Sequence, residues 1–403
     1  MRFAIENRLR WPPPSGPLGI DQRWFLVFAF AVAALSHVAI QPAVGQELGT
    51  SDAGYIDGAI VRNQLRFRFD AGYDNPFPDR AEFFYAKCGC FTNGNGPGPP
   101  LQETGLDYQE VEAYLEYTFS SRFSGFVEVP FRFINPEANA NAAGLGDVRA
   151  GFKYALIDDA DRWLTFQLRS YFPSGDGVRG LGTEHFSLEP GFLFQQNFDG
   201  VSVFGDFKTW IPFDSSKQNS TTNGGLLLGP AALEVDYSGT VTRYGIGFSY
   251  DLFRDTGVIR AQNSPYPTHQ STTPFQSGRY SLQPGYTSYR SIPATYTQNG
   301  FRAPQKHDEY QSPEVAEDAI YRSYSAGSRL AAVVEVVGWT VGGGLKLSPE
   351  GTLRDATNDT IVNLKLGLRW NTASNTFYVG YGRALTGEIW YQDFVRAEYG
   401  VRF

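Results

Sequence analysis

Three residues, His185, Ser187 and Glu189, carry the side chains of a serine hydrolase at alternate positions. A hydroxyl beside an imidazole base, with a third group to orient the base, is the arrangement used in nucleophilic catalysis. Neighbours two apart on a strand are separated by about 6.5–7 Å, which is too far for a nucleophile–base hydrogen bond. We therefore expect no enzyme and no catalytic residue, and we keep a membrane-embedded hydrolase centred near His185 as an alternative.

Two cysteines, Cys88 and Cys90, form a C-x-C pair. In an exported protein this pair favours a small disulfide loop, because two thiols alone are too few for structural zinc. The Cα spacing lies near the upper limit for bridging, so the redox state of the pair stays open. We expect no metal and no cofactor.

Charged residues alternate with apolar ones in many segments, so that they share one face of each expected strand. The clearest candidates to line an interior are Glu110, Glu112, Glu116, Glu128, Arg132, Arg149, Lys153 and Arg169. Positive and negative groups are nearly balanced in this set. One interpretation is a structural ladder of salt bridges, and the other is a polar permeation path.

The elements that must position these side chains are strands. Over 110–119, Val111, Ala113, Leu115, Tyr117 and Phe119 share one face, opposite the glutamates. Twelve segments with this period-2 pattern are expected, at 59–71, 107–119, 122–134, 146–156, 162–172, 184–196, 200–211, 240–253, 328–340, 359–370, 376–383 and 390–403. The fold class is therefore all-β. An even number of strands near 9–11 residues predicts a transmembrane antiparallel up-and-down β-barrel.

The connections support a barrel over a soluble sandwich. Tight polar turns, such as 158–161 and 371–375, alternate with long loops such as 72–106 and 212–239. Short turns at one end and long loops at the other are typical of outer-membrane barrels, and both termini are then expected at the periplasmic end. Aromatic residues near the strand ends fit a girdle at the lipid headgroups.

The last segment, 390–403, alternates apolar and polar residues and stops at Phe403. It resembles the C-terminal signal strand of Gram-negative outer-membrane proteins, which ends on an aromatic residue. That resemblance implies that Phe403 is an assembly signal for the barrel-assembly machinery.

Residues 1–45 have the features of a secretory signal peptide. Arginines precede an apolar stretch over 24–40, and the small residues Ala43 and Gly45 predict cleavage before Gln46. An uncleaved anchor is the alternative. Outside this leader no run of 18 apolar residues exists, which excludes a polytopic helical membrane protein. The net charge of −8 for the chain makes nucleic acid an unsuitable partner.

One connection, 254–327, is long although the alternation of short turns and long loops predicts a short periplasmic turn at this position. Its centre is rich in Pro, Ser, Thr, Gln and Tyr and lacks apolar periodicity. We interpret it as a disordered insert in the barrel of residues 46–403, and a periplasmic tether or partial plug is the alternative.

Two motifs indicate a family. Gly144-Leu145-Gly146-Asp147, continuing to Tyr154, resembles a "GxGDxxxGxKY" strand opening, and Pro173-Ser174-Gly175-Asp176 is similar to "PTGD". This order resembles transporter-type outer-membrane barrels described as meta-pathway phenol-degradation proteins. The resemblance is best over 144–253 and implies passage of small aromatic or hydrophobic compounds, without catalytic residues.

The hypothesis from sequence is a barrel in the outer-membrane lipid that gives passage to small solutes of unknown identity. The alternative is a plugged structural or surface-interaction barrel without transport activity.

Overall fold

The computed structural model describes residues 54–77, 85–87, 98–213, 238–255, 327–348, 353–386 and 391–403. The chain divides into two compact units, of which one comprises residues 1–256 and 326–403 and the other residues 257–325. The signal peptide, Cys88, Cys90 and nearly all of the 254–327 insert lie outside the described residues, so the predictions made for them stay predictions.

The described part of the larger unit consists of β-strands and connections. Twelve strands make up the barrel: β1 (Gln64–Asn75), β2 (Leu106–Ser120), β3 (Phe123–Pro136), β5 (Val148–Asp158), β6 (Arg162–Phe172), β7 (Ser187–Phe198), β8 (Val201–Pro212), β9 (Val241–Arg254), β10 (Arg329–Val341), β13 (Thr360–Asn371), β14 (Asn375–Ala384) and β15 (Asp393–Arg402). The short β4 (Ala142–Leu145) pairs with β3, and β11 (Leu345–Leu347) pairs with β12 (Leu353–Asp355). Within the described ranges no helix is long and apolar enough to cross a bilayer.

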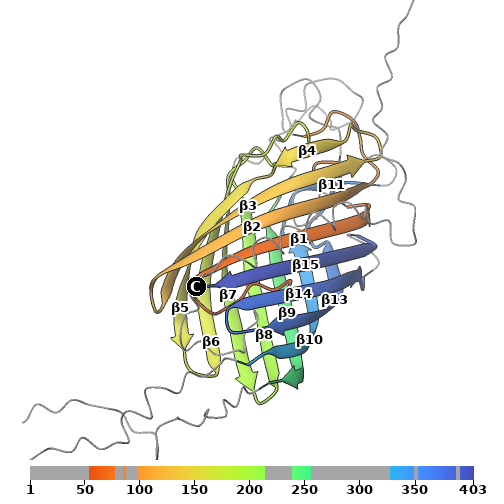
Figure 1. The fold of residues 1–403 in the computed structure, drawn as a ribbon. Helices are drawn as coiled ribbons and strands as arrows, with labels where there is room; N and C mark the ends of the chain where they lie inside the picture. The colour runs from red at the N-terminus through yellow and green to blue at the C-terminus, as the bar shows by residue number, and fades with distance from the viewer. Residues whose placement is uncertain are drawn as a thin grey trace, which may run out of the picture. The chain divides into compact units, whose positions relative to one another are not determined.

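The sheet closes on itself between its first and last strands. β1 pairs antiparallel with β15 from Gln64↔Arg402 to Tyr73↔Asp393, and its other edge pairs with β2. Figure 1 shows β1 between these two strands. Closure satisfies backbone N–H and C=O groups that an open edge would leave unpaired in lipid. The predicted twelve-stranded antiparallel barrel is confirmed.

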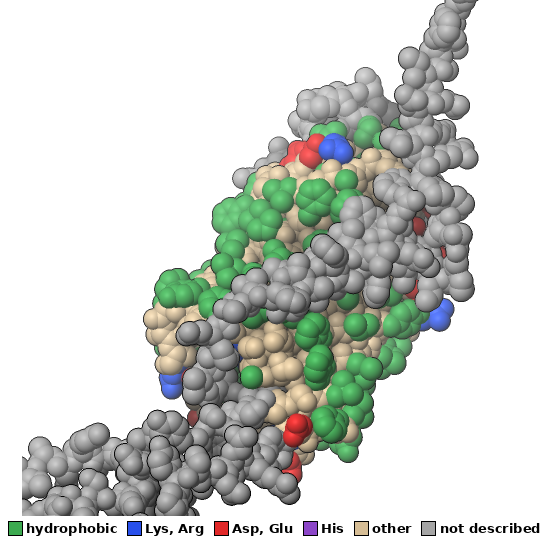
Figure 2. Space-filling view, viewed as in Figure 1, with side chains coloured by type: hydrophobic (Ala, Val, Ile, Leu, Met, Phe, Trp, Pro, Cys, Tyr) green, Lys and Arg blue, Asp and Glu red, His purple; other side chains and the backbone are tan. Residues whose placement is uncertain are grey.

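The two faces of the wall differ as the alternation predicted. On β2, Leu115 and Tyr117 are 42% and 53% exposed on the outer face, whereas Glu112 and Glu116 point inward and are at most 3% exposed. Figure 2 shows hydrophobic side chains spread over the visible face of the barrel. An apolar exterior and a polar, filled interior suit a barrel that is surrounded by lipid.

Tight turns gather at one end of the barrel together with the chain terminus. The backbone N–H of Phe403 donates to the carbonyl of Asn63 at 3.3 Å, and Asn63 accepts from the backbone N–H of Thr118 at 2.7 Å. Thr118 lies beside the β2–β3 turn, and Arg402 bonds to Ser374 in the β13–β14 turn. The start of β1 and the end of β15 therefore share the end with the short turns.

One strand prediction was wrong in part. The first strand was predicted at 59–71, but β1 begins at Gln64, and residues 59–63 lie inside the barrel. Ala59, Ile60 and Val61 are consecutive apolar residues, and the alternation of polar and apolar residues begins only at Gln64, where β1 starts. The other eleven strands begin and end within three residues of their predicted bounds.

Candidate functional site: the barrel lumen

The eight charged residues singled out from the sequence are buried in ion pairs on the inner face of β2, β3, β5 and β6. We call these residues the ion-pair ladder. Its contacts are Arg132–Glu110 at 2.6 Å, Arg149–Glu112 at 2.5 Å, Arg149–Glu128 at 3.2 Å, Arg169–Glu128 at 2.9 Å and Lys153–Glu116 at 3.1 Å. Removing one partner of such a pair leaves an uncompensated buried charge, so the ladder holds this part of the wall in one arrangement.

Glu116 shows how completely the ladder is packed. Its carboxylate is fully buried and accepts hydrogen bonds from the hydroxyls of Tyr114 at 2.5 Å and Ser124 at 2.7 Å. The amide of Gln64 and the ammonium of Lys153 donate to the same carboxylate at 2.8 and 3.1 Å. The backbone N–H of Arg62 adds a fifth, longer contact at 3.4 Å, and a carboxylate with this many donors is stable as the anion away from bulk water. This part of the lumen is therefore filled by side chains.

A second component of the lumen is the chain itself. Residues 54–63, which we call the inner segment, precede β1 and run back through the barrel interior from Asn63. Near its start, the backbone N–H groups of Tyr55 and Ile56 donate to the carboxylate of Glu335 on β10 at 2.9 and 3.0 Å. The carbonyl of Gly54 accepts from Arg396 on β15 at 2.8 Å. The inner segment is thus bonded to two strands that are distant from β1 in sequence.

Asp57 joins the inner segment to strands β6 and β8, across the barrel from β15. Its carboxylate lies 2.8 Å from Nη2 of Arg169 on β6 and 2.8 Å from Nζ of Lys208 on β8. The amide of Gln167 adds a longer contact at 3.3 Å. Asp57 thus makes an ion pair between the inner segment and the ion-pair ladder, because Arg169 belongs to the ladder.

Backbone carbonyls extend this attachment toward the tight-turn end. The carbonyl of Gly58 accepts from Nζ of Lys153 at 3.1 Å, and the carbonyl of Ala59 accepts from the hydroxyl of Thr165 at 2.5 Å. Wall side chains therefore satisfy backbone groups that the inner segment could not pair within itself. The segment narrows the lumen over the length at which these contacts occur.

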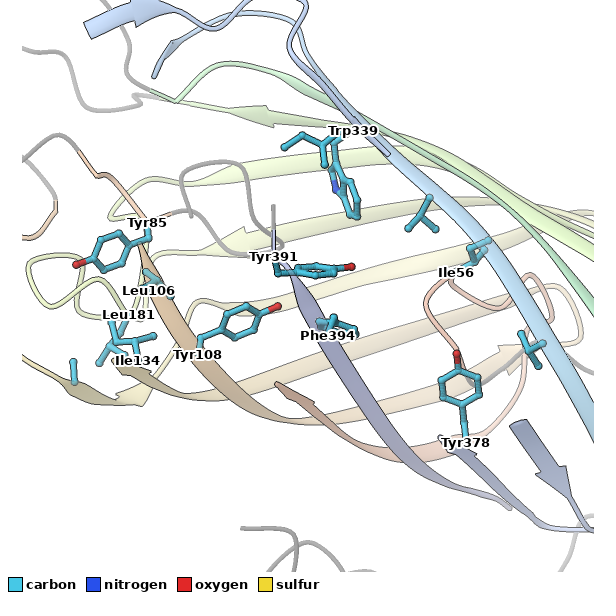
Figure 3. Packing of buried hydrophobic residues seen from close by; sticks show 14 of the residues in the cluster. Ile56, Tyr85, Leu106, Tyr108, Ile134, Leu181, Trp339, Tyr378, Tyr391 and Phe394 are labelled. Carbon is cyan, nitrogen blue, oxygen red and sulfur yellow. The ribbon is translucent and has the colours of Figure 1, made fainter. Parts of the chain in front are cut away.

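Aromatic side chains surround the start of the inner segment. The ring of Tyr55 meets Trp339 and Phe394 edge-on, at centroid distances of 6.0 and 5.6 Å, and Tyr391 stacks on Phe394 at 4.9 Å. The ammonium of Lys365 lies 2.9 Å from the Tyr55 centroid and 3.8 Å from that of Phe394. Figure 3 shows Trp339 reaching into the interior from β10, and Tyr391 and Phe394 from the start of β15 and the residues just before it. This region combines apolar surface with cation–π contacts.

The apolar interior continues among the long loops. Tyr85, Leu181 and Ile134 belong to the same buried cluster as the aromatic side chains of the lumen. Burial raises the pKa of Tyr85 above its usual value, so the phenol stays neutral. Gly180 has a φ of +76°, and a Cβ at this position would collide with the Tyr85 ring. The loop therefore needs glycine to pass this close to the ring.

A cavity lies beside the inner segment, and Tyr55, Asp57 and Trp339 are among the residues that line it. The cavity is small, with a volume of about 70 Å³, and it is partly open to its surroundings. Arg149 and Arg169 of the ion-pair ladder line it, together with other cationic residues of the wall. A solute could lie in this cavity, between the inner segment and the strands.

The geometry of His185 corrects the argument made from strand spacing. The Ser187 hydroxyl lies 3.1 Å from Nδ1 of His185, which is within hydrogen-bond reach. His185 precedes β7 and follows Glu184, whose φ is +57°, so the spacing of an extended strand does not apply. On its other side, Nε2 of His185 lies 3.1 Å from the hydroxyl of Ser238. The expected third member, Glu189, instead pairs with Arg169 and Arg243.

The cluster of His185, Ser187 and Ser238 holds two parts of the chain together. His185, Ser187 and Ser238 are each at most 4% exposed, and the His185 ring lies 5.6 Å from that of Trp210. The three polar groups join the start of β7 to the chain just before β9. In the part of the chain that the structure describes, no group of three His, Cys, Asp or Glu side chains is placed to hold a metal ion.

Sequence reasoning missed the inner segment. The available signal was Gly54-Tyr55-Ile56-Asp57-Gly58, a glycine-flanked acidic residue between the leader and the first strand. This pattern alone does not distinguish a segment inside a barrel from a short external linker.

The closed antiparallel sheet, the apolar exterior and the charged interior define the chain as a transmembrane β-barrel. It is similar in fold to the COG4313 outer membrane channel from Pseudomonas putida F1, with 10% identity over 87% of this chain and 99% of that chain and a TM-score of 0.45. The NanC porin has 7% identity over 85% of this chain and 98% of that chain, with a TM-score of 0.34. The β domain of the Bordetella autotransporter BrkA has 9% identity over 85% and 100%, with a TM-score of 0.37.

No protein-family model matches the sequence, and no curated protein matches it. The resemblance to the meta-pathway family therefore has no support beyond the motifs themselves.

Proposed function

We propose that this protein is an outer-membrane barrel that gives passage to small solutes through a narrowed lumen. The observation that carries the proposal is the cavity between the inner segment and the wall, inside a barrel whose outer face is apolar. A narrow path lined by fixed charges and aromatic rings selects solutes by size and by chemistry.

The chemistry of the interior supports small aromatic or hydrophobic solutes, as the family resemblance implies. Tyr55, Trp339, Tyr391 and Phe394 offer ring faces and edges inside the barrel. Aromatic solutes can pack against such rings in offset or edge-to-face contacts. The export leader and the sheet closure are consistent with insertion into outer-membrane lipid through the barrel-assembly machinery, with both termini on the periplasmic side.

Transport can be tested with purified protein in planar bilayers and in liposomes. We expect a small conductance and uptake of small solutes, with larger hydrophilic solutes excluded by the inner segment. Absence of both conductance and uptake, in the wild type and in a variant that lacks residues 46–58, would contradict the proposal.

The alternative is a structural or surface-interaction barrel without transport. The inner segment and the ion-pair ladder favour it, because together they fill much of the described lumen with paired groups. A barrel that stays closed to every solute after the inner segment is removed would have this role.

We propose further that the barrel is not an enzyme. The burial of His185 and Ser187 supports this, since both side chains are at most 4% exposed.

A further inference from the structure

The side chains that line the lumen cavity are unequal in charge. Among the described residues that line it, two carry carboxylates, Asp57 and Asp206. Six are cationic and come from six strands around the barrel: Arg68, Arg149, Arg169, Lys208, Arg243 and Arg396. The balance of charge that holds for the interior as a whole therefore does not hold at the surface of the cavity.

The compensating glutamates lie behind the cations. Arg149 is held by Glu112 and Glu128, and Arg243 lies 2.9 Å from Glu189. None of these three glutamates lines the cavity. The carboxylates thus fix each guanidinium against the wall, while the guanidinium contributes to the cavity surface. A guanidinium carries five N–H donors and suits planar carboxylates, so an anion in the cavity would meet donors from several directions.

Part of the cavity lining is aromatic and apolar. Tyr55, Tyr244 and Trp339 line it together with Val337 and the backbone of Gly338. Trp339 and Tyr55 already meet edge-on, which leaves an aromatic surface next to the cationic one. A ligand that fits both surfaces has a flat apolar body and a negative group.

We propose that the cavity is a binding site for small aromatic carboxylates. The inference deepens the proposed function, because it names the charge and class of solute that the narrowed lumen takes. A site of this kind requires a negative group on the ligand, whereas a general preference for hydrophobic compounds does not.

Binding can be measured with three probes of matched size and different charge. Isothermal titration of the purified protein with benzoate, benzyl alcohol and benzylamine separates the carboxylate from the ring. We expect benzoate to bind about tenfold or more tightly than either of the other two, because charge-assisted hydrogen bonds are stronger than neutral ones. Equal affinity for the three probes, no measurable benzoate binding, or a preference for benzylamine would overturn the inference.

A matched pair of variants tests the location. Arg243 lines the cavity and Arg66 does not. The two arginines are otherwise alike: their side chains are 18% and 13% exposed, and each lies 2.9 Å from a buried glutamate. We expect Arg243→Gln to weaken benzoate binding by about tenfold and Arg66→Gln to change it by less than about twofold. Equal losses in the two variants would place the site elsewhere. If Arg243→Gln does not fold, the comparison of the three probes on the wild type still decides the inference.

Uptake into liposomes separates this inference from the proposed function. If neutral and anionic solutes enter equally and benzoate is not bound preferentially, the inference fails and transport stands. If benzoate is bound preferentially but no solute enters, transport fails and the binding site stands.

Discussion

The carboxylate of Asp57 lies 2.8 Å from the guanidinium of Arg169, which also lies 2.7 Å from Glu189 and 2.9 Å from Glu128. Arg169 is therefore shared between the inner segment and the wall of the barrel. Because its two wall partners remain when Asp57 is changed, the attachment of the inner segment can be weakened without dismantling the ion-pair ladder.

Asp57→Asn should release the inner segment in part. Arg169 and Lys208 each lose a charged partner, while the size of the side chain hardly changes. We expect single-channel conductance to rise by about twofold or more, with more frequent current fluctuations. Asp355→Asn is the control, because Asp355 lies on β12, outside the barrel wall, and bonds to Thr357. Identical current traces from the two variants would contradict a role of the inner segment in narrowing the path.

Glu116→Gln should destabilise the barrel. The Lys153–Glu116 pair is fully buried, so neutralising the glutamate leaves the ammonium without its charged partner. We expect a loss of about 3–5 kcal/mol in the free energy of unfolding, measured by denaturant titration in detergent. In the exposed pair Arg162–Asp159, Asp159→Asn should leave the free energy of unfolding nearly unchanged, because water screens both charges. Similar losses for both substitutions would show that the ladder is open to water.

Removal of β15 should prevent assembly. Deleting residues 393–403 leaves the outer edges of β1 and β14 without partners, and each unpaired backbone group costs several kcal/mol in lipid. We expect no folded, heat-modifiable band on electrophoresis. Deleting Phe403 alone should lower the yield of folded barrel, because its backbone bond to Asn63 is a small part of the closure. A normal yield from the longer truncation would argue against closure through β15.

His185→Ala should affect stability and not chemistry. The substitution removes the imidazole between Ser187 and Ser238 and leaves two buried hydroxyls with lost contacts. We expect a decrease of about 1–3 kcal/mol in the free energy of unfolding. Hydrolysis of phospholipid by the wild type that disappears in His185→Ala would instead support the hydrolase alternative.

The strands could be predicted from the sequence because each wall residue contacts either the interior or lipid. Leu115 and Glu116 differ in polarity for this reason, and the period of two follows directly from strand geometry. The position of the inner segment could not be predicted in this way. Its contacts with Glu335 and Arg396 depend on where distant strands lie after closure, and that arrangement leaves no local pattern around Tyr55.

The functional residues show the same division. The sequence identified Glu110 and Arg132 as inward-facing, since the face follows from alternation. Their pairing depends on the register of β2 and β3, which turn length and the opposite strand determine together. The bond between His185 and Ser187 was missed because the strand was predicted to begin at residue 184, whereas β7 begins at Ser187.

Opposite charges on neighbouring strands also have a consequence for how the barrel forms. Glu110 lies directly across from Arg132, Glu128 from Arg149, and Arg169 from Glu189. A slip of one position between two strands would turn a whole row of these groups toward the hydrocarbon, where an arginine at the midplane costs about 2–4 kcal/mol. The charged rows therefore favour the correct register during insertion. A hairpin in the wrong register is higher in free energy before the barrel closes.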